Sequence, residues 1–199
     1  VQNQYVRGWL EQGGRWLGLH GTAGGKAARG AKGERRRMVK AGHHETLGGF
    51  FINHPPIRKF EVNVGDTHDI FTRDLPESFE TIDEPYMIEV QAPEETRVLL
   101  TAELGPDVSP PGFGFDYDED TALLPDGKTR VMGYTRDIGD GGVTYIALGH
   151  AHSPLSNSQP FVDDSVAEAG VTPTVLRVTW ETPAYMQLLR NSIAWGMGG

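Results

Sequence analysis

The sequence predicts an α/β fold with a mainly parallel sheet, in which polar site residues follow the carboxyl ends of the strands. Three observations predict it. A helical segment at 1–12 ends at the glycines at 13–14, and a short apolar strand at 15–20 follows directly. The apolar run 143–148 has the composition of a fully buried strand. A well-delimited helix at 182–196 closes the chain.

Length and composition favour one globular domain over 1–199 and exclude several classes of function. The 199 residues are 38% hydrophobic, and no apolar run approaches the roughly 20 residues of a membrane span. With 18 basic and 27 acidic residues, the net charge of −9 disfavours nucleic acid and anionic membranes as partners. The absence of cysteine excludes disulfides, thiolate nucleophiles and Cys-ligated zinc, and is compatible with the cytoplasmic location that we expect. The composition is compatible with a monomer and with a homo-oligomer.

The first elements lead to a histidine. No strand precedes the helix at 1–12, so we expect that an amino-terminal strand–helix unit is missing from this chain. The strand at 15–20 ends in His20, which lies between Gly18 and Gly21. This outline is typical of an elbow, in which a reactive side chain occupies a strained turn after a strand. The elbow predicts that His20 lies at a site.

The glycine- and arginine-rich segment 21–49 is predicted to be a solvated basic loop leading into a helix. Phosphate binding is the alternative, but no Gly-Lys pair is followed by Ser or Thr, so the P-loop pattern is absent. The triplet 50–52 is apolar and should be buried, and the prolines at 55–56 force an extended exit.

Strands are expected at 60–64, 97–102 and 130–136, besides the run at 143–148. Between them the sequence predicts a polar turn at 66–70, a long surface insertion at 105–128, and a hairpin-type turn at 140–142. In the last helix, Thr182 suits the N-cap, Pro183 the first helical position, and Gly196 the end.

Histidines and carboxylates form the candidate groups for chemistry. His20 and His150 both follow predicted strands, and in a twisted sheet they would point into one crevice. For each, the competing interpretation is a structural hydrogen bond. His152 could share the face of His150, and such a pair could bind a metal ion. The remaining candidates are His54, Asp66 with His68, which could equally stabilise a turn, and Asp83-Glu84 with Tyr86, where only one of the adjacent carboxylates should reach a site.

Several motifs occur together in a fixed order along the chain. They are Gly-Gly-Arg-Trp-Leu-Gly-Leu-His at 13–20, Leu-Gly-Gly-Phe-Phe-Ile-Asn-His-Pro at 47–55, Asp-Thr-His-Asp-Ile at 66–70, Phe-Glu-Thr-Ile-Asp-Glu-Pro-Tyr at 79–86, Leu-Gly-His at 148–150 and Ile-Ala-Trp-Gly at 193–196. In this order they resemble the trehalose-utilisation (ThuA-like) family of the class I glutamine amidotransferase-like superfamily.

The resemblance implies a flavodoxin-like three-layer fold, with a mainly parallel sheet flanked by helices, and a missing first strand. It implies carbohydrate metabolism, with hydrolysis or processing of a disaccharide or keto-sugar derivative. The polar residues that match the family pattern are His20, His54, Asp66, His68, Glu84, Tyr86 and His150.

Two departures from the pattern bear on chemistry. Amidotransferases carry a cysteine at the elbow, where this chain has His20, so glutamine hydrolysis through a thioester is excluded. The family's Asp-x-His motif is usually followed by proline, where this chain has Asp69.

The first hypothesis is therefore an enzyme acting on a small sugar derivative. His20 and His150 would act as general acid/base groups with Glu84 as their carboxylate partner, while His54, Tyr86, Asp66 and His68 would bind substrate. Its variant is a metal-dependent hydrolase, with a divalent ion such as zinc on His20, His54 and His150. The rival class is a non-catalytic binding or interaction domain, which would gain if these side chains did not face one pocket.

Overall fold

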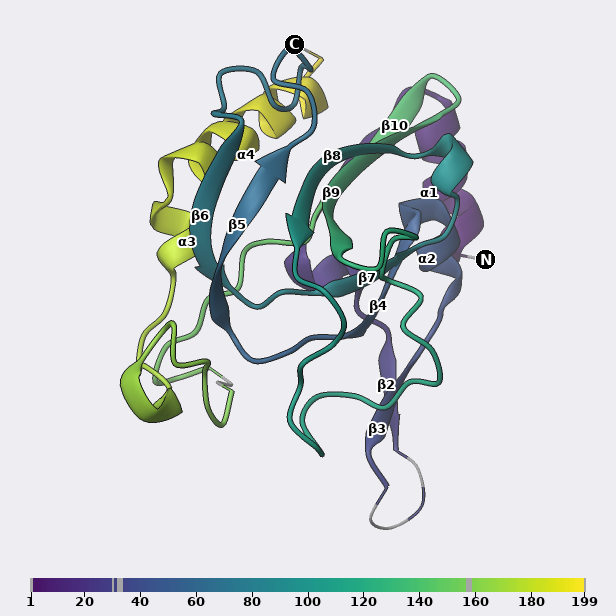
Figure 1. Cartoon of the computed structure of the whole chain (residues 1–199). Helices are drawn as coiled ribbons and strands as arrows, with labels where there is room; N and C mark the ends of the chain where they lie inside the picture. The colour runs from purple at the N-terminus through teal and green to yellow at the C-terminus, as the bar shows by residue number, and fades with distance from the viewer. Residues whose placement is uncertain (1, 30, 32–33, 157–158, 199) are drawn as a thin grey trace.

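A computed structural model of the chain describes residues 2–29, 31, 34–156 and 159–198. Ten strands form three sheets in this part of the chain (Figure 1). The largest sheet has six strands in the order β1-β10-β9-β8-β5-β6, and β2-β3 and β4-β7 are two-stranded. The strands are β1 (Arg15–Leu19), β2 (Lys26–Arg29), β3 (Arg36–Val39), β4 (Gly49–Asn53), β5 (Arg58–Val64), β6 (Ser78–Asp83), β7 (Met87–Val90), β8 (Arg97–Glu103), β9 (Thr129–Ile138) and β10 (Gly141–Ile146).

Helices are few and mostly short. The α-helices are α1 (Gln2–Glu11), α2 (Gly42–Leu47), α3 (Val178–Glu181) and α4 (Pro183–Gly196), and the 3₁₀ turns are η1 (His20–Ala23), η2 (Pro93–Glu95) and η3 (Glu168–Gly170). The predicted first and last helices are confirmed as α1 and α4. In the described residues, no helix combines the length and apolarity that crossing a membrane requires.

The α/β class is confirmed, but the mainly parallel, flavodoxin-like layout is not. In the six-stranded sheet only β1 and β10 pair in parallel, and every other neighbouring pair is antiparallel. The connection between β9 and β10 explains part of the difference, because the two residues between Ile138 and Gly141 can join only antiparallel neighbours.

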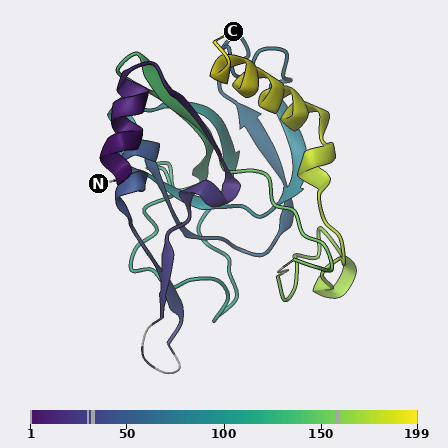
Figure 2. The same cartoon turned by 180° about the vertical axis from the view of Figure 1, so that it is seen from behind.

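Strand β10 lies between two apolar layers. Val143 and Tyr145 belong to a core cluster that includes Leu10 of α1, whereas Ile146 belongs to a second cluster with Leu188 of α4. Figures 1 and 2 show α1 beside β10 and α4 on the opposite side, flanking β5 and β6. Because successive side chains of a strand point to opposite faces, β10 can pack toward α1 on one face and toward α4 on the other.

The sheet curls, and this brings distant strand ends together (Figure 1). Four antiparallel pairings separate β10 from β6, so β6 runs in the same direction as β10 and β1. The carboxyl ends of these three strands therefore lie at the same edge of the sheet. Strands β5 and β8 pair at only two positions, Asn63 with Thr101 and Val64 with Leu100, which lets the β5–β6 pair diverge from the rest.

Candidate functional site

His20 lies in a strained turn at the end of β1. Its φ angle of 36° is in the left-handed region, which costs a non-glycine residue about 1–2 kcal/mol, and such strain tends to occur at functional sites. The turn is held by the Tyr145 hydroxyl, which donates to the His20 carbonyl at 2.8 Å. The ring stacks on Tyr86 with centroids 3.9 Å apart. The elbow predicted from the sequence is therefore present, with an imidazole at its tip.

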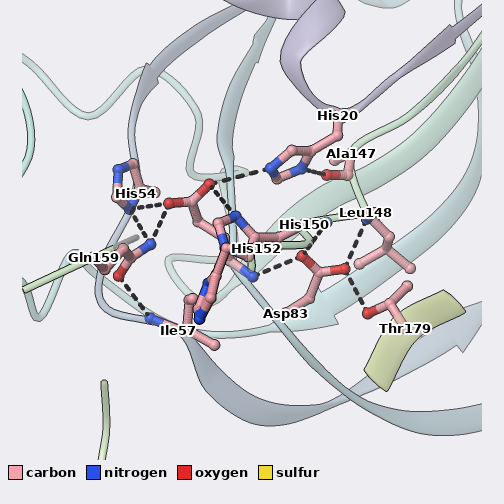
Figure 3. Close-up of polar contacts among 12 residues, drawn as sticks. His20, His54, Ile57, Asp83, Ala147, Leu148, His150, His152, Gln159 and Thr179 are labelled. Carbon is pink, nitrogen blue, oxygen red and sulfur yellow. Dashed lines mark hydrogen bonds and ion pairs between the residues drawn. The ribbon is translucent and has the colours of Figure 1, made fainter. Parts of the chain in front are cut away.

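Glu84, the residue after β6, is the centre of a polar cluster. Figure 3 labels four of its partners, His20, His54, His150 and Gln159. Its Oε2 lies 3.1 Å from His20 Nε2 and 3.2 Å from His150 Nδ1. Its Oε1 lies 3.2 Å from His54 Nδ1 and accepts a hydrogen bond from the Gln159 amide. The carboxylate is 7% exposed. Three imidazoles thus meet at one buried carboxylate.

Asp83 holds the ends of β6 and β10 together. It is fully buried, and its Oδ1 accepts from the backbone N–H groups of Glu84 at 2.7 Å and His150 at 3.0 Å. Its Oδ2 accepts from the Gly149 N–H at 2.7 Å and from the Thr179 hydroxyl at 2.6 Å. Asp83 thereby positions the backbone of both Glu84 and His150 without entering the pocket.

Glycine is required next to this anchor. Gly149 has a φ angle of 124°, and a Cβ there would lie 2.7 Å from the Tyr185 hydroxyl oxygen. Only glycine allows the chain leaving β10 to turn over Asp83 at this point. In the Gly-His pair of the sequence, Gly149 therefore makes the turn and His150 contacts Glu84.

His150 is the first member of a chain of hydrogen-bonded rings. Its Nε2 lies 3.1 Å from His152 Nδ1, and His152 Nε2 lies 2.7 Å from the Pro173 carbonyl oxygen. His152 is buried. The pair that the sequence suggested as joint metal ligands is thus a relay, in which His152 orients His150.

His54 follows β4 and reaches the cluster from another side. Its Nδ1 lies 3.0 Å from the Pro55 carbonyl oxygen, as well as near Glu84. Burial lowers the pKa of His54 despite the opposing charge of Glu84. The ring is therefore neutral near pH 7. Among the described residues its polar contacts are made through Nδ1, so Nε2 is the nitrogen that remains.

The cluster shifts the pKa values of its members in opposite directions. Burial alone would raise the pKa of Glu84, but the hydrogen bonds to His150 and His20 outweigh it and lower the pKa far below its usual range. Burial would lower the pKa of His20, but the Glu84 hydrogen bond and the charges of Asp83 and Glu84 outweigh it, so that this pKa is raised. Burial raises the pKa of Tyr86, which keeps its hydroxyl protonated as a donor. Such perturbed groups in a cleft mark a functional site.

The cluster forms the floor of a pocket of about 860 Å³. Its walls carry an unusual share of aromatic rings, those of Phe51, Tyr86, Phe113 and Phe115. The pocket thus combines flat apolar ring faces with a few directed polar groups, as small-molecule sites do.

The basic segment and the acidic insertion build one wall of this pocket together. The segment predicted as a solvated loop contains the β2–β3 hairpin, and Arg35 next to β3 donates to the carbonyls of Phe113 and Phe115. Arg37 pairs with Asp118 at 2.5 Å. The expectation of a solvated loop is therefore corrected for Arg35, whose guanidinium is bound by the insertion.

Two candidate residues lie elsewhere. Asp66 and His68 are exposed on the turn between β5 and β6, where Asp66 Oδ1 accepts from the His68 N–H at 2.8 Å. Neither lines the pocket. The structure thus brings together His20, His54, Glu84, Tyr86 and His150, and gives Asp66 and His68 the geometry of a turn.

A metal ion could be held by three of the clustered residues. His20, Glu84 and His150 each offer a ligand atom within 4.8 Å of the others. In the described residues this set contains Glu84 in place of His54, which the sequence had suggested as the third ligand.

Sequence reasoning missed several residues of the site. Gln159 lies in a segment without periodicity, and Phe113 and Phe115 lie in the insertion, so no local pattern marked them. Asp83 was recognisable as one of two adjacent carboxylates, and the period of a strand correctly predicted that only one would face the site.

Comparisons with known proteins agree with the resemblance. The sequence model of the family ThuA, described as trehalose utilisation, matches residues 1–166. A ThuA-like protein from Bacteroides uniformis has a similar crystal structure, with a TM-score of 0.57 at 16% identity over 98% of this chain. A ThuA-like protein from Parabacteroides merdae gives 0.53 at 15% identity, also over 98%. This chain spans 63% and 65% of those two chains. No curated protein matches the sequence.

Proposed function

The chain belongs to the ThuA family of trehalose utilisation, and from that premise we propose that it is an enzyme that hydrolyses or otherwise processes a disaccharide or keto-sugar derivative. The reactive centre is the cluster of His20, Glu84 and His150, and His54 and Tyr86 contact the sugar.

One observation carries the proposal: the ends of four strands deliver polar groups to a single pocket. His20 follows β1, His54 follows β4, Glu84 follows β6 and His150 comes shortly after β10. A pocket of about 860 Å³ is of the size that small-molecule sites have, and a disaccharide fits that range. Structural histidines would have no reason to converge on one carboxylate beside an open pocket, so convergence favours an enzyme over a binding domain.

The electrostatics support these proposed roles. Glu84 is ionised because the imidazoles lower its pKa, so it orients and polarises the rings and does not donate a proton. His54 is neutral, which leaves its Nε2 as an acceptor for a sugar hydroxyl or a water molecule. Tyr86 stays protonated and presents a donor together with a flat ring face.

The test is an assay with the full chain on disaccharides and on their 3-keto forms, with product release followed by chromatography. We expect turnover of at least one of them. His20→Ala should lower turnover by about 100-fold or more, the range for loss of a general acid or base, while His68→Ala on the exposed turn should leave it unchanged.

Absence of turnover for all sugars, with an unrelated ligand found in the His20 pocket, would contradict the proposal. Ligand binding that survives His20→Ala without any turnover would instead identify a non-catalytic binding domain.

A further inference from the structure

The hydrogen bonds of His20 fix which of its nitrogens carries a proton. Nδ1 lies 2.7 Å from the carbonyl oxygen of Ala147, which can only accept. Nδ1 is therefore the protonated nitrogen of the neutral ring. In this neutral ring the other nitrogen, Nε2, directs a lone pair at Glu84 Oε2, 3.1 Å away, whereas in the protonated ring Nε2 donates to that oxygen. A metal ion would take the place of that proton.

The same argument, taken through two rings, fixes His150. The Pro173 carbonyl accepts from His152 Nε2, so His152 Nδ1 is an acceptor. It receives the proton of His150 Nε2 at 3.1 Å. His150 Nδ1 is then unprotonated and directs its lone pair at the same Oε2 of Glu84, at 3.2 Å.

When both rings are neutral, three acceptors therefore converge: two imidazole lone pairs and a carboxylate oxygen (Figure 3). One additional proton would give only one of the two imidazoles an N–H that can donate to Glu84 Oε2. Two additional protons would create two cationic rings with centroids 5.7 Å apart. A single cation among the three atoms satisfies all of them at once.

We propose that His20 Nε2, His150 Nδ1 and Glu84 Oε2 bind one divalent transition-metal ion of the Zn²⁺ class. Two imidazoles and a carboxylate are the ligand set of catalytic zinc sites, which keep a further position open. Ligands about 2.1 Å from one tetrahedral ion lie about 3.4 Å from each other, close to the separations seen at Glu84 Oε2.

The surroundings provide the outer contacts that such a site needs. Metal-bound imidazoles donate their second N–H to a carbonyl or another acceptor. His20 donates to Ala147, and His150 donates to His152. The second oxygen of Glu84 is held by Gln159 and His54. The side of the cluster that lines the pocket remains for a substrate oxygen. With the ion bound, His20 and His150 would serve as its ligands and not as general acid/base groups. The chemistry that the ion would support rests on the proposed function, whereas binding of the ion requires no substrate.

The experiment is a calorimetric titration of the metal-depleted full chain with Zn²⁺ alone. We expect one ion per chain. His20→Ala, Glu84→Gln and His150→Ala should each weaken binding by more than about 100-fold, since loss of an outer contact alone costs about 10–100-fold. His68→Ala is the matched control and should bind as tightly as the unaltered chain. Circular dichroism of each variant verifies its fold.

His152→Leu tests the relay separately, because His152 does not touch the ion. Losing the acceptor for His150 Nε2–H should weaken Zn²⁺ binding by about 10–100-fold. Absence of Zn²⁺ binding, or equal binding by the unaltered chain and the His20→Ala and His150→Ala variants, would overturn the proposal. Full sugar turnover by the metal-free chain would contradict the metal proposal and support the proposed enzymatic function. Zn²⁺ binding without turnover of any sugar would support the metal proposal and contradict the proposed function.

Discussion

At the scale of single residues, the candidate site depends on one carboxylate that does not line the pocket. Asp83 accepts four hydrogen bonds and joins the end of β6 to the chain after β10. Complete burial raises the pKa of Asp83, and the donors around it oppose that rise. It is a positioning residue, because its effect on the pocket passes through Glu84 and His150.

Asp83→Ala should therefore be among the most damaging substitutions in the chain. It leaves three N–H groups in or near the core without their acceptor and removes one of the acceptors of the Thr179 hydroxyl, which should lower the free energy of unfolding by about 2–4 kcal/mol. Urea unfolding measures the loss. Glu80→Ala, on the exposed side of the same strand, is the control and should cost less than about 1 kcal/mol. Equal effects of the two substitutions would show that Asp83 does not hold the strand ends together.

At the scale of elements, one wall of the pocket depends on an arginine. Arg35 joins the β2–β3 hairpin to the insertion through the carbonyls of Phe113 and Phe115. Arg35→Ala should let the insertion open more often, because loss of these charge-assisted bonds corresponds to about tenfold in the local opening equilibrium. Chymotrypsin cleavage after the aromatic residues at 113–117 should accelerate about tenfold.

Arg37→Ala supplies the matched comparison. Its pairs with Asp116 and Asp118 are exposed, so they should contribute little and cleavage should be nearly unchanged. Faster cleavage in Arg37→Ala than in Arg35→Ala would assign the anchoring of this wall to the surface pairs.

Some of the strands could be predicted from the sequence, but their directions could not. Strands at 60–64, 97–102, 130–136 and 143–148 were predictable because each has apolar periodicity, and they correspond to β5, β8, β9 and β10. Their directions differ from the prediction because the turn at 140–142 is short and, in the described residues 58–146, no α-helix lies between these strands. Parallel neighbours need a crossover of a dozen or more residues, usually a helix. No local pattern predicted the hairpin β2–β3, whose strands pair with each other and whose Arg35 and Arg37 contact the non-periodic insertion.

The site was more predictable than the topology, for a physical reason. His20, Glu84 and His150 follow strands that run in one direction, and that common direction, not parallel pairing between neighbours, is what gathers their side chains. Asp66 and His68 belong to a turn at the opposite end of β5 from His54, so the same rule explains why they lie apart.

At the scale of the whole molecule, the buried His44 should make folding stability fall as the pH drops below 7, whereas His20, whose pKa is raised, contributes in the opposite direction. Burial lowers the pKa of His44, whose Nδ1 accepts the Ala41 N–H at 2.8 Å and must lose that bond on protonation. Between its folded pKa and the ordinary value near 6.5, the unfolded chain binds more protons than the folded one, so stability rises with pH in that window. Carboxylates extend the effect to lower pH, because the hydrogen bonds of Glu89 and Asp107 outweigh burial and lower their pKa values. The stabilisation by these carboxylates is present above their unfolded pKa and is lost as the pH falls through their folded pKa.

Urea midpoints at pH 7, 5.5 and 4 measure the histidine effect and the carboxylate effect. In His44→Gln the decline between pH 7 and 5.5 should shrink while the decline below pH 5 remains, and an unchanged profile in that variant would show that another group binds the proton.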